Sequence, residues 1–404
     1  MIELFKIAWR DLGRNRRRSF FSALALGLGV ALLLLISSAV NGEMYGSLEN
    51  SIRLVSGHLQ VRSKTYNAAK NSLAFADLVE NPEQVAAQIA ALPDVQVATP
   101  RLYGSGILTT ADTSTGVAIV GIDPASPANA PYRDGMLAGS FLAADDREGF
   151  IIGKALAAKL GAGVGDQINL LVNTSNGDAG SQTFTVRGIF STGTPTYDNV
   201  TIFLPLAKLQ ALTQTESHAS AIWILLKDRD RTDAVAAALK SDRYQIVNWV
   251  DQNTFLFEFQ QMAGSYMGLI YLIVLAITAT VIINTLIMAV FERTREIGIL
   301  AAIGMKGGRI MAMFFAESVY LAVGGILIGL ALGGVLVALF QTYGFPIGNL
   351  GTNLLLGERI YARLAVGDAV NLTVMALIVT LLAALYPASL AARMEPVDAL
   401  RGGK

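Results

Sequence analysis

The uncharged run Phe20–Val40 reads FFSALALGLGVALLLLISSAV. It reaches the roughly 20 residues that an α-helix needs to cross about 30 Å of hydrocarbon. Three further runs have the same character, with Glu317 as their one charged residue: Met262–Val290, Ile310–Phe340 and Ala369–Ala392. Within a bilayer only helices and closed barrels satisfy their own backbone groups, and runs this long exclude barrel strands. We therefore predict an α-helical membrane protein with four transmembrane helices.

The composition supports this class. Of the 404 residues, 53% are hydrophobic and only 15% are charged, whereas soluble domains carry about 25% charged residues. The net charge is zero, but residues 42–264 hold 16 Lys or Arg against 22 Asp or Glu, and the remainder holds 15 against 9. The chain has no cysteine, which excludes a disulfide framework and a cysteine-based metal site.

Basic residues set the predicted orientation. They cluster before the first run, between the second and third, and after the fourth: Lys6, Arg10, Arg14, Arg16, Arg17 and Arg18; Arg293, Arg295, Lys306 and Arg309; Arg393, Arg401 and Lys404. The positive-inside rule therefore places both termini and the 291–309 loop in the cytosol. A cleaved signal peptide is the alternative for the first run, because Ser37-Ser38-Ala39 offers small residues. That run is longer than the usual apolar region of about 7–15 residues, and cleavage leaves an odd number of spans.

These signals divide the chain into nine expected segments. They are a cytosolic interfacial amphipathic helix (1–19), transmembrane helix 1 (20–41), an extracytoplasmic α+β domain with stalk ends (42–264), transmembrane helix 2 (265–291), a cytosolic coupling segment (292–309), transmembrane helix 3 (310–340), a short outer loop (341–367), transmembrane helix 4 (368–392) and a cytosolic tail (393–404). The first segment has Leu4, Trp9 and Leu12 on one helical face, which favours a helix lying in the membrane interface. A basic anchor that only fixes topology is the alternative.

The domain inserted between the first two spans has mixed patterns. Strand-like segments are Gly57–Arg62, Gly116–Ile122, Gln167–Val172, Gln182–Phe190, Val200–Leu204 and Ala221–Lys227. Helical patterns lie at 82–92, 153–160, 205–212 and 232–239. We expect two lobes joined by a loop at Ala125–Asp146, where Pro and Gly recur.

Two helical patterns extend beyond the bilayer. One runs from near Asn253 to Phe291, which at 1.5 Å per residue is roughly 58 Å. The other continues past Val40 to Ile52. We expect the two extensions to pair as a stalk. A break at Gly42 or Gly264 is the alternative.

No catalytic constellation stands out. His58 and His218 show no metal-ligand spacing, and Gly149–Ala155 is one residue short of a phosphate-binding loop and lacks its hydroxyl. We expect no catalytic residue, no metal site and no cofactor in this chain.

The segment between the second and third spans carries the most specific signal. It reads FERTREIGILAAIGMK from Phe291 to Lys306, with Ile297, Leu300 and Ile303 at helical spacing. The pattern is typical of a short amphipathic helix that docks into a groove on a partner. The segment resembles the R-E-I-G-I-L-R-A-I-G-A sequence of FtsX-like, or MacB-type, permeases of ABC transporters. The tail from Glu395 to Arg401 resembles the P-x-x-A-L-R ending of that family.

Within the family the sequence looks most like the lipoprotein-releasing permeases. Asn41-Gly42, Ser56-Gly57-His58, Ile152–Leu156 with Gly165-Asp166, and Val186–Phe190 resemble theirs. Two features depart from the pattern. The turn Asn173–Ser181 is short and polar where some of those permeases carry a longer hairpin that meets a soluble carrier. The Arg expected near Ala301 is absent.

The resemblance implies a non-catalytic permease subunit in a bacterial plasma (inner) membrane, with a MacB-type periplasmic core. Its implied partners are two copies of an ABC ATPase subunit, which bind ATP and Mg²⁺, a second permease chain (a copy or a paralogue), membrane lipids, an amphipathic or lipoprotein cargo, and a periplasmic carrier or adaptor, with no nucleic acid. Lipoprotein release is the function that this likeness favours. Drug or peptide efflux, and a lever that regulates an extracellular cell-wall enzyme, are the alternatives.

Two groups of residues are the candidate sites. For coupling to the ATPase we expect Ile297, Leu300 and Ile303 in its groove, Glu296 and Arg293 pairing at the rim of that groove, Gly298 permitting close approach, and Gly304 ending the helix. For the cargo, apolar side chains at the outer ends of the first two helices are the candidates: Leu48, Phe255, Phe259, Met262 and Tyr266. Packing between stalks of two permease chains is the alternative for these. Glu317 is expected to hydrogen-bond a neighbouring helix.

Overall fold

The computed structural model describes residues 10, 13–14, 16–68, 70–346 and 359–395. The chain divides into two compact units. The helical unit comprises Met1–Met44, Glu258–Phe345 and Ile360–Lys404, and the α/β unit comprises Tyr45–Phe257 and Pro346–Arg359. Most of the predicted interfacial helix, the middle of the predicted outer loop and most of the predicted tail lie outside the described residues.

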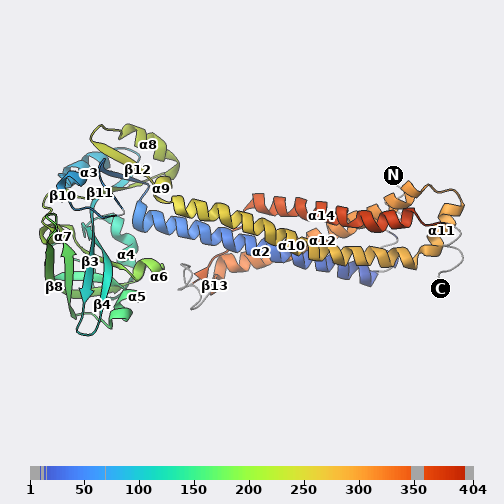
Figure 1. Cartoon of the computed structure of the whole chain (residues 1–404), viewed down its shortest axis with the longest axis horizontal. Coiled ribbons are helices and arrows are strands. Elements are labelled where there is room, and N and C mark those ends of the chain that lie inside the picture. The colour runs from blue at the N-terminus through green and yellow to red at the C-terminus, as the bar shows by residue number, and fades with distance from the viewer. Residues whose placement is uncertain (1–9, 11–12, 15, 69, 347–358, 396–404) are drawn as a thin grey trace. The chain divides into compact units, whose positions relative to one another are not determined.

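The four predicted apolar helices are present. They are α2 (Arg16–Ser51), α10 (Thr254–Glu292), α12 (Gly307–Tyr343) and α14 (Val366–Ala392), and each is long and apolar enough to cross a membrane (Figure 1). The short helix α11 (Thr294–Ala302) connects α10 to α12. Neither α2 nor α10 breaks at Gly42 or Gly264, which confirms the predicted continuous helices. Pairing along the whole stalk stays a prediction.

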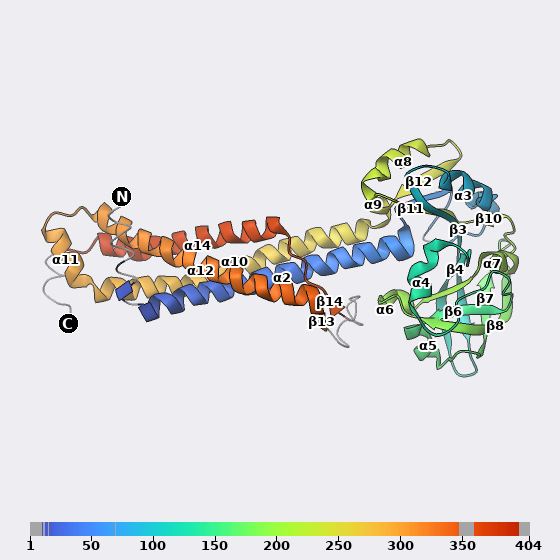
Figure 2. The same cartoon turned by 180° about the vertical axis from the view of Figure 1, so that it is seen from behind.

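Small residues allow the helical unit to pack closely. A Cβ on Gly325 would lie 2.9 Å from the Ala23 carbonyl oxygen, and one on Gly329 would lie 2.7 Å from the Gly27 oxygen. Glycines four residues apart on α12 therefore let the backbone of α2 approach, a common mode of packing between membrane helices. Helices α12 and α14 lie side by side (Figure 2). The apolar cluster between the helices includes Leu33, Leu286 and Ala376.

The α/β unit is built on one ten-stranded mixed sheet. Its strand order is β12-β1-β11-β3-β4-β9-β6-β8-β5, and β7 pairs with both β3 and β8. Most pairs are antiparallel, while β4–β9 and β6–β8 are parallel. The strands of this sheet are β1 (Leu59–Ser63), β3 (Val95–Thr109), β4 (Ser114–Ile122), β5 (Met136–Gly139), β6 (Gly149–Gly153), β7 (Gln167–Asn173), β8 (Ala179–Phe190), β9 (Thr201–Pro205), β11 (Ala221–Leu226) and β12 (Tyr244–Asn248).

Short helices and two small ladders complete the described elements. The helices are α3 (Pro82–Ala90), α4 (Ala130–Asp134), α5 (Lys154–Leu160), α6 (Pro195–Asp198), α7 (Leu206–Thr213), α8 (Thr232–Ala238) and α9 (Trp249–Gln252), with the π-helical turn η1 (Ile52–Ser56) and the 3₁₀ turns η2 (Phe75–Asp77), η3 (Pro127–Asn129) and η4 (Arg229–Arg231). Strand β2 (Val79–Glu80) pairs with β10 (His218–Ala219). Strands β13 (Phe345–Pro346) and β14 (Arg359–Ile360) form the second ladder.

The predicted strands and helices of this unit are present, but its organisation differs in two ways. In place of the expected two lobes there is one continuous sheet with three apolar clusters. One includes Leu170 and Phe184, another Leu59 and Ile224, and the third Tyr132 and Phe203. The prediction of a loop at Ala125–Asp146 is wrong, because this stretch contains η3, α4 and β5. Its Pro residues lie in the first turns of η3 and α4, where the missing N–H has no intrahelical role.

Candidate functional site

Helix α11 is held between two sharp turns. The backbone leaves α10 at Arg293, where Thr294 Oγ1 donates a hydrogen bond to the Phe291 carbonyl oxygen over 2.8 Å. At its other end, Met305 N donates to the Leu300 oxygen over 3.0 Å, and Gly304 has a φ of 99°. This positive φ ends the helix, the role predicted for Gly304. The predicted coupling residues thus lie on one short element with fixed ends.

The inner face of α11 is part of the core of its own unit. Ile297 is 1% exposed and packs in a cluster with Val290, Phe314 and Ala388. Gly298 is buried as well. The expectation that Ile297 enters a partner's groove is therefore corrected, because α10, α12 and α14 already cover that side chain.

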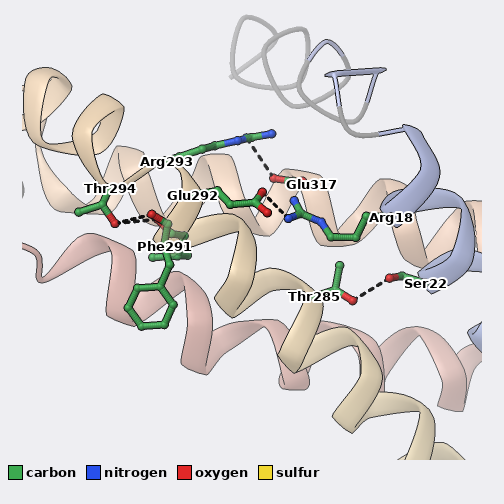
Figure 3. Close-up of polar contacts among 9 residues, drawn as sticks. Arg18, Ser22, Thr285, Phe291, Glu292, Arg293, Thr294 and Glu317 are labelled. Atoms are coloured by element: carbon green, nitrogen blue, oxygen red, sulfur yellow. Dashed lines mark hydrogen bonds and ion pairs between the residues drawn. The ribbon is translucent and has the colours of Figure 1, made fainter. Parts of the chain in front are cut away.

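Three ion pairs connect this segment to the rest of the unit. Figure 3 shows those of Arg293 and Arg18. Arg293 Nη1 lies 3.6 Å from Glu317 Oε2, with side-chain exposures of 6% and 5%. Arg18 pairs with Glu292. Ser22 and Thr285 also share a hydrogen bond of 2.7 Å, which ties α2 to α10 near the same end.

The prediction that Arg293 lies at the rim of a partner's groove is wrong, because its side chain is buried, whereas the role of the exposed Glu296 there stays a prediction. Glu296 Oε1 accepts a hydrogen bond from Arg14 Nη1 over 2.8 Å, with both side chains at least half exposed. Arg293 pairs inward with Glu317 of α12 instead. Glu317 therefore forms an ion pair with the residue that precedes α11, while the predicted hydrogen bond to a neighbouring helix stays a prediction. Because a buried charge is costly without a partner, the pair fixes how α11 is set against α12.

The outer face of α11 carries apolar side chains that the chain leaves exposed. Ile303 is 80% exposed and Ile299 is 43% exposed. They lie four residues apart, on the face that also carries the exposed Arg295. Leu300 is half-buried at the edge of this face. Ile299 and Ile303 therefore form an exposed apolar face on this segment, and Ile299 is a residue that the sequence-based prediction omitted.

The predicted cargo residues of α10 are exposed on one stripe. Phe255, Phe259, Met262 and Tyr266 are 67%, 46%, 49% and 60% exposed, at spacings of four, three and four residues. Such spacings repeat along one face of a helix. Leu48 of α2 is half-buried. The role of all five as cargo contacts stays a prediction.

The two histidines have structural contacts in the α/β unit. His58 Nδ1 accepts a hydrogen bond from the Leu226 backbone N–H over 2.9 Å. His218 makes an edge contact with Phe75, with ring centroids 4.8 Å apart. Across residues 10, 13–14, 16–68, 70–346 and 359–395, no group of three or more His, Cys, Asp or Glu side chains is arranged to hold a metal ion.

Two family models match the chain in succession. The MacB-like periplasmic core domain matches residues 19–242, more than half of the chain. The FtsX-like permease C-terminal model matches residues 268–396. The second match includes α11, α12 and α14, and therefore the ion pair between Arg293 and Glu317.

Three curated proteins illustrate the range of relatives. The lipoprotein-releasing system transmembrane protein LolC of Neisseria meningitidis is 25% identical over 98% of each chain. The lipoprotein-releasing system transmembrane protein LolE of Haemophilus influenzae is also 25% identical over 98% of each chain. The macrolide export ATP-binding/permease protein MacB of Chlorobaculum tepidum is 24% identical over 98% of this chain and 60% of its own length.

Proposed function

This chain belongs to the family of ABC transporter permeases that join a MacB-like periplasmic core domain to an FtsX-like permease C-terminal region, and we propose that it releases lipoproteins from the membrane. The observation that carries the proposal is the extent of its likeness to LolC and LolE, which covers 98% of this chain and 98% of each relative. The cargo is then a protein with an N-terminal lipid anchor.

The proposed orientation puts α11 in the cytosol and the α/β unit outside it. The chain of the α/β unit runs mainly between α2 and α10, so it forms the large extracytoplasmic insertion between the first two spans. Basic residues near α11 support this orientation, with Arg14 and Arg18 of the N-terminal segment paired to Glu296 and Glu292. Both termini are then cytosolic, in the inner membrane of a bacterium.

The Ile299–Ile303 face is the proposed contact with the ATPase. Two ATPase subunits bind ATP and Mg²⁺, and this chain is the non-catalytic permease paired with a second copy or a paralogue. An apolar pair flanked by charge suits a groove on a partner, because buried apolar anchors carry most interface energy. The Arg293–Glu317 pair and Ile297 hold α11 so that force on its outer face reaches α10 and α12.

The exposed stripe of α10 is the proposed contact with the acyl chains of the cargo. Phe255, Phe259, Met262 and Tyr266 present apolar and aromatic surface, and a lipid anchor provides matching apolar surface. The turn at 173–181 is not the proposed contact with a soluble carrier. Its Ser175 Oγ donates to the Gln214 carbonyl oxygen over 2.8 Å, so the turn is tied to its own unit.

An acylated reporter in the native host tests this function. The reporter is a fluorescent protein with a lipoprotein signal and its lipid-anchored cysteine, and the control has that cysteine replaced by serine. Depletion of this chain is expected to hold the acylated reporter in the inner-membrane fraction and leave the control unaffected. Unchanged sorting of the acylated reporter on depletion would contradict lipoprotein release.

Export of a macrolide is the second candidate, and the alignment with MacB supports it. The same depletion strain separates the two functions. Increased accumulation of labelled erythromycin, with normal sorting of the acylated reporter, would favour export. Trapped reporter with unchanged erythromycin accumulation would favour lipoprotein release.

A further inference from the structure

Helix α2 ends inside the α/β unit in an unusual turn. Residues Ile52–Ser56 form a single π-helical turn, closed by a hydrogen bond of 2.8 Å from Gly57 N to the Ile52 oxygen. Gly57 then has a φ of 62°, and a Cβ there would lie 2.7 Å from the Ile224 oxygen. Because only glycine fits this position without strain, the chain leaves the helix in one fixed direction.

The last carbonyl groups of this turn are bonded by side chains from the surrounding unit. A helix end leaves such carbonyls without intrahelical partners. The donors are Arg101 Nη1 to Leu54 O (3.0 Å), Tyr132 Oη to Leu54 O (2.6 Å), Trp223 Nε1 to Val55 O (3.1 Å), and Gln60 Nε2 to Val55 O (3.0 Å) and Ser56 O (2.9 Å). These donor side chains belong to β3, α4, β11 and β1, so four separate elements donate hydrogen bonds to one turn.

Arg101 is the charged member of this group. It is 1% exposed, and its guanidinium carbon lies 4.2 Å from the centroid of the Trp223 ring and 6.0 Å from that of Tyr132. Among the described residues, its Nε and Nη2 have no hydrogen-bond partner. The partly negative C-terminal end of a helix and the faces of aromatic rings both attract a cation. The helix end and the rings therefore hold a charge that burial alone would disfavour.

The start of α10 is tied to the same turn. Gln252 Nε2 donates to the Ser56 oxygen over 3.3 Å, and Ser51 Oγ donates to Asn253 Oδ1. Asn253 in turn donates to the Trp249 oxygen over 2.7 Å. The two chain connections to the α/β unit are therefore linked to each other where they enter it.

We propose that Arg101 is a positioning residue that, with Trp223 and Tyr132, makes the end of α2 a rigid joint. Turning α2 at this point would separate several buried donors from their acceptors at once, which is unfavourable. A displacement of α2 is therefore passed to the α/β unit and is not absorbed at the connection. The source of that displacement rests on the proposed function, whereas the rigidity of the joint does not.

Spin labels can measure this rigidity, because the chain has no native cysteine. Tyr45→Cys on α2 and Ala211→Cys on α7 both replace exposed residues of the α/β unit. In the full chain in lipid nanodiscs, double electron–electron resonance is expected to give one narrow peak for the distance between the two labels. Arg101→Met, and separately Tyr132→Phe with Trp223→Phe, are expected to lose that single peak and give a broad distribution.

Arg133→Met is the matched control. Arg133 also donates to a backbone carbonyl, that of Pro124 over 2.8 Å, and also lies over a ring, that of Phe141 at 5.0 Å. Neither of these contacts is with the Ile52–Ser56 turn, so the variant is expected to keep the narrow peak. If Arg101→Met fails to fold, the Tyr132→Phe, Trp223→Phe variant decides. A wild-type distribution in that double variant would overturn the rigid joint.

A second readout separates this inference from the proposed function. In the depletion strain, Arg101→Met is expected to slow sorting of the acylated reporter while the ATPase that copurifies with the chain keeps its basal rate. Wild-type sorting by Arg101→Met, with a broad distance distribution, would overturn the role of the joint in transmission. Failure of the wild-type chain to sort the reporter would contradict lipoprotein release and leave the distance test of the joint intact.

Discussion

Arg293 of the helical unit and Arg101 of the α/β unit are 5% and 1% exposed, and among the described residues no other arginine is buried to this degree. Arg293 lies 3.6 Å from the Glu317 carboxylate. Arg101 has no ion pair with a described carboxylate, and its contacts are a helix-end carbonyl and two rings. One arginine is thus neutralised by an opposite charge, and the other is stabilised by dipoles and π-electrons.

The difference predicts different consequences when each side chain is removed. Without Arg293, the buried carboxylate of Glu317 loses its charged partner. Without Arg101, only neutral carbonyls and rings remain, and the Leu54 oxygen still accepts a hydrogen bond from Tyr132. Removing one member of a buried ion pair therefore leaves the other as a buried charge without its counter-charge. Removing a charge that is stabilised by carbonyl dipoles and aromatic rings leaves only neutral groups.

The largest effect is expected for Arg293→Met. Breaking a buried ion pair on one side costs about 3–5 kcal/mol, because the other charge stays buried and loses its opposite charge. We expect this loss in the free energy of unfolding of the detergent-solubilised chain. The double variant Arg293→Met, Glu317→Met is expected to recover most of it. Equal losses in the single and double variants would show that the pair is not what stabilises α11.

A smaller loss is expected for Arg101→Met. Hydrogen bonds to charged groups contribute about 1.5–3 kcal/mol, and no opposite charge remains behind. Denaturant unfolding followed by Trp fluorescence measures it, with Arg101→Lys expected to lie between the wild type and Arg101→Met. A loss as large as that of Arg293→Met would remove the distinction between the two sites.

The sequence predicted the four long helices and their extensions because hydrocarbon and backbone satisfaction leave few alternatives. It did not predict β3, the strand at the centre of the sheet. Pro100, Gly104 and Gly106 are typical breakers of strands, yet all three pair within β3. Long-range pairing with β4, β7 and β11 overrides these local preferences.

In the candidate site, too, long-range contacts decide what local sequence patterns do not predict. Apolar spacing and Gly304 predicted a short helix at α11, but spacing alone does not tell which face the rest of the chain covers. Phe314 of α12 and Ala388 of α14 cover Ile297, and Glu317 draws Arg293 inward. These contacts come from elements far along the sequence. The rotation of α11, and with it the exposure of Ile299, follows from the tertiary structure only.

The exposed face of α11 gives a third prediction. Ile303→Asp is expected to weaken binding of the copurifying ATPase by about 2 kcal/mol, because it removes an apolar interface anchor. Its free energy of unfolding should not change, since Ile303 is 80% exposed. Ile297→Asp is the matched variant and is expected to lose stability, because it buries a charge in the core of the helical unit.

Pull-down from solubilised membranes measures the first effect, and thermal unfolding measures the second. Leu300→Asp, at the half-buried edge, is expected to show both effects in weaker form. Wild-type binding by Ile303→Asp, together with lost binding by a stably folded Ile297→Asp, would place the docking surface on the inner face and contradict the structure.

The smallest expected effect is the pH dependence of stability, which should differ between the α/β unit and the helical unit. Burial lowers the pKa of His58 below its ordinary value of 6.5, and Arg229 lowers it further, against the opposing charges of Glu49 and Asp228. The neutral ring is the form that accepts the hydrogen bond from the Leu226 N–H. The Arg293–Glu317 ion pair of the helical unit contains no histidine. The titration of His58 is therefore expected to affect the stability of the α/β unit only.

The sign of the pH effect follows from proton binding. Between pH 6.5 and the lowered pKa of folded His58, the unfolded chain binds a proton that the folded chain does not, so stability falls as the pH falls. The contribution of His58 is therefore fully present above pH 6.5 and is lost through the folded pKa. His58→Asn keeps a side-chain acceptor and removes the titration. We expect the protection of the Leu226 amide from hydrogen exchange to weaken on acidification in the wild type relative to His58→Asn measured at the same pH. Parallel pH profiles for the two proteins would mean that His58 does not sense pH at this position.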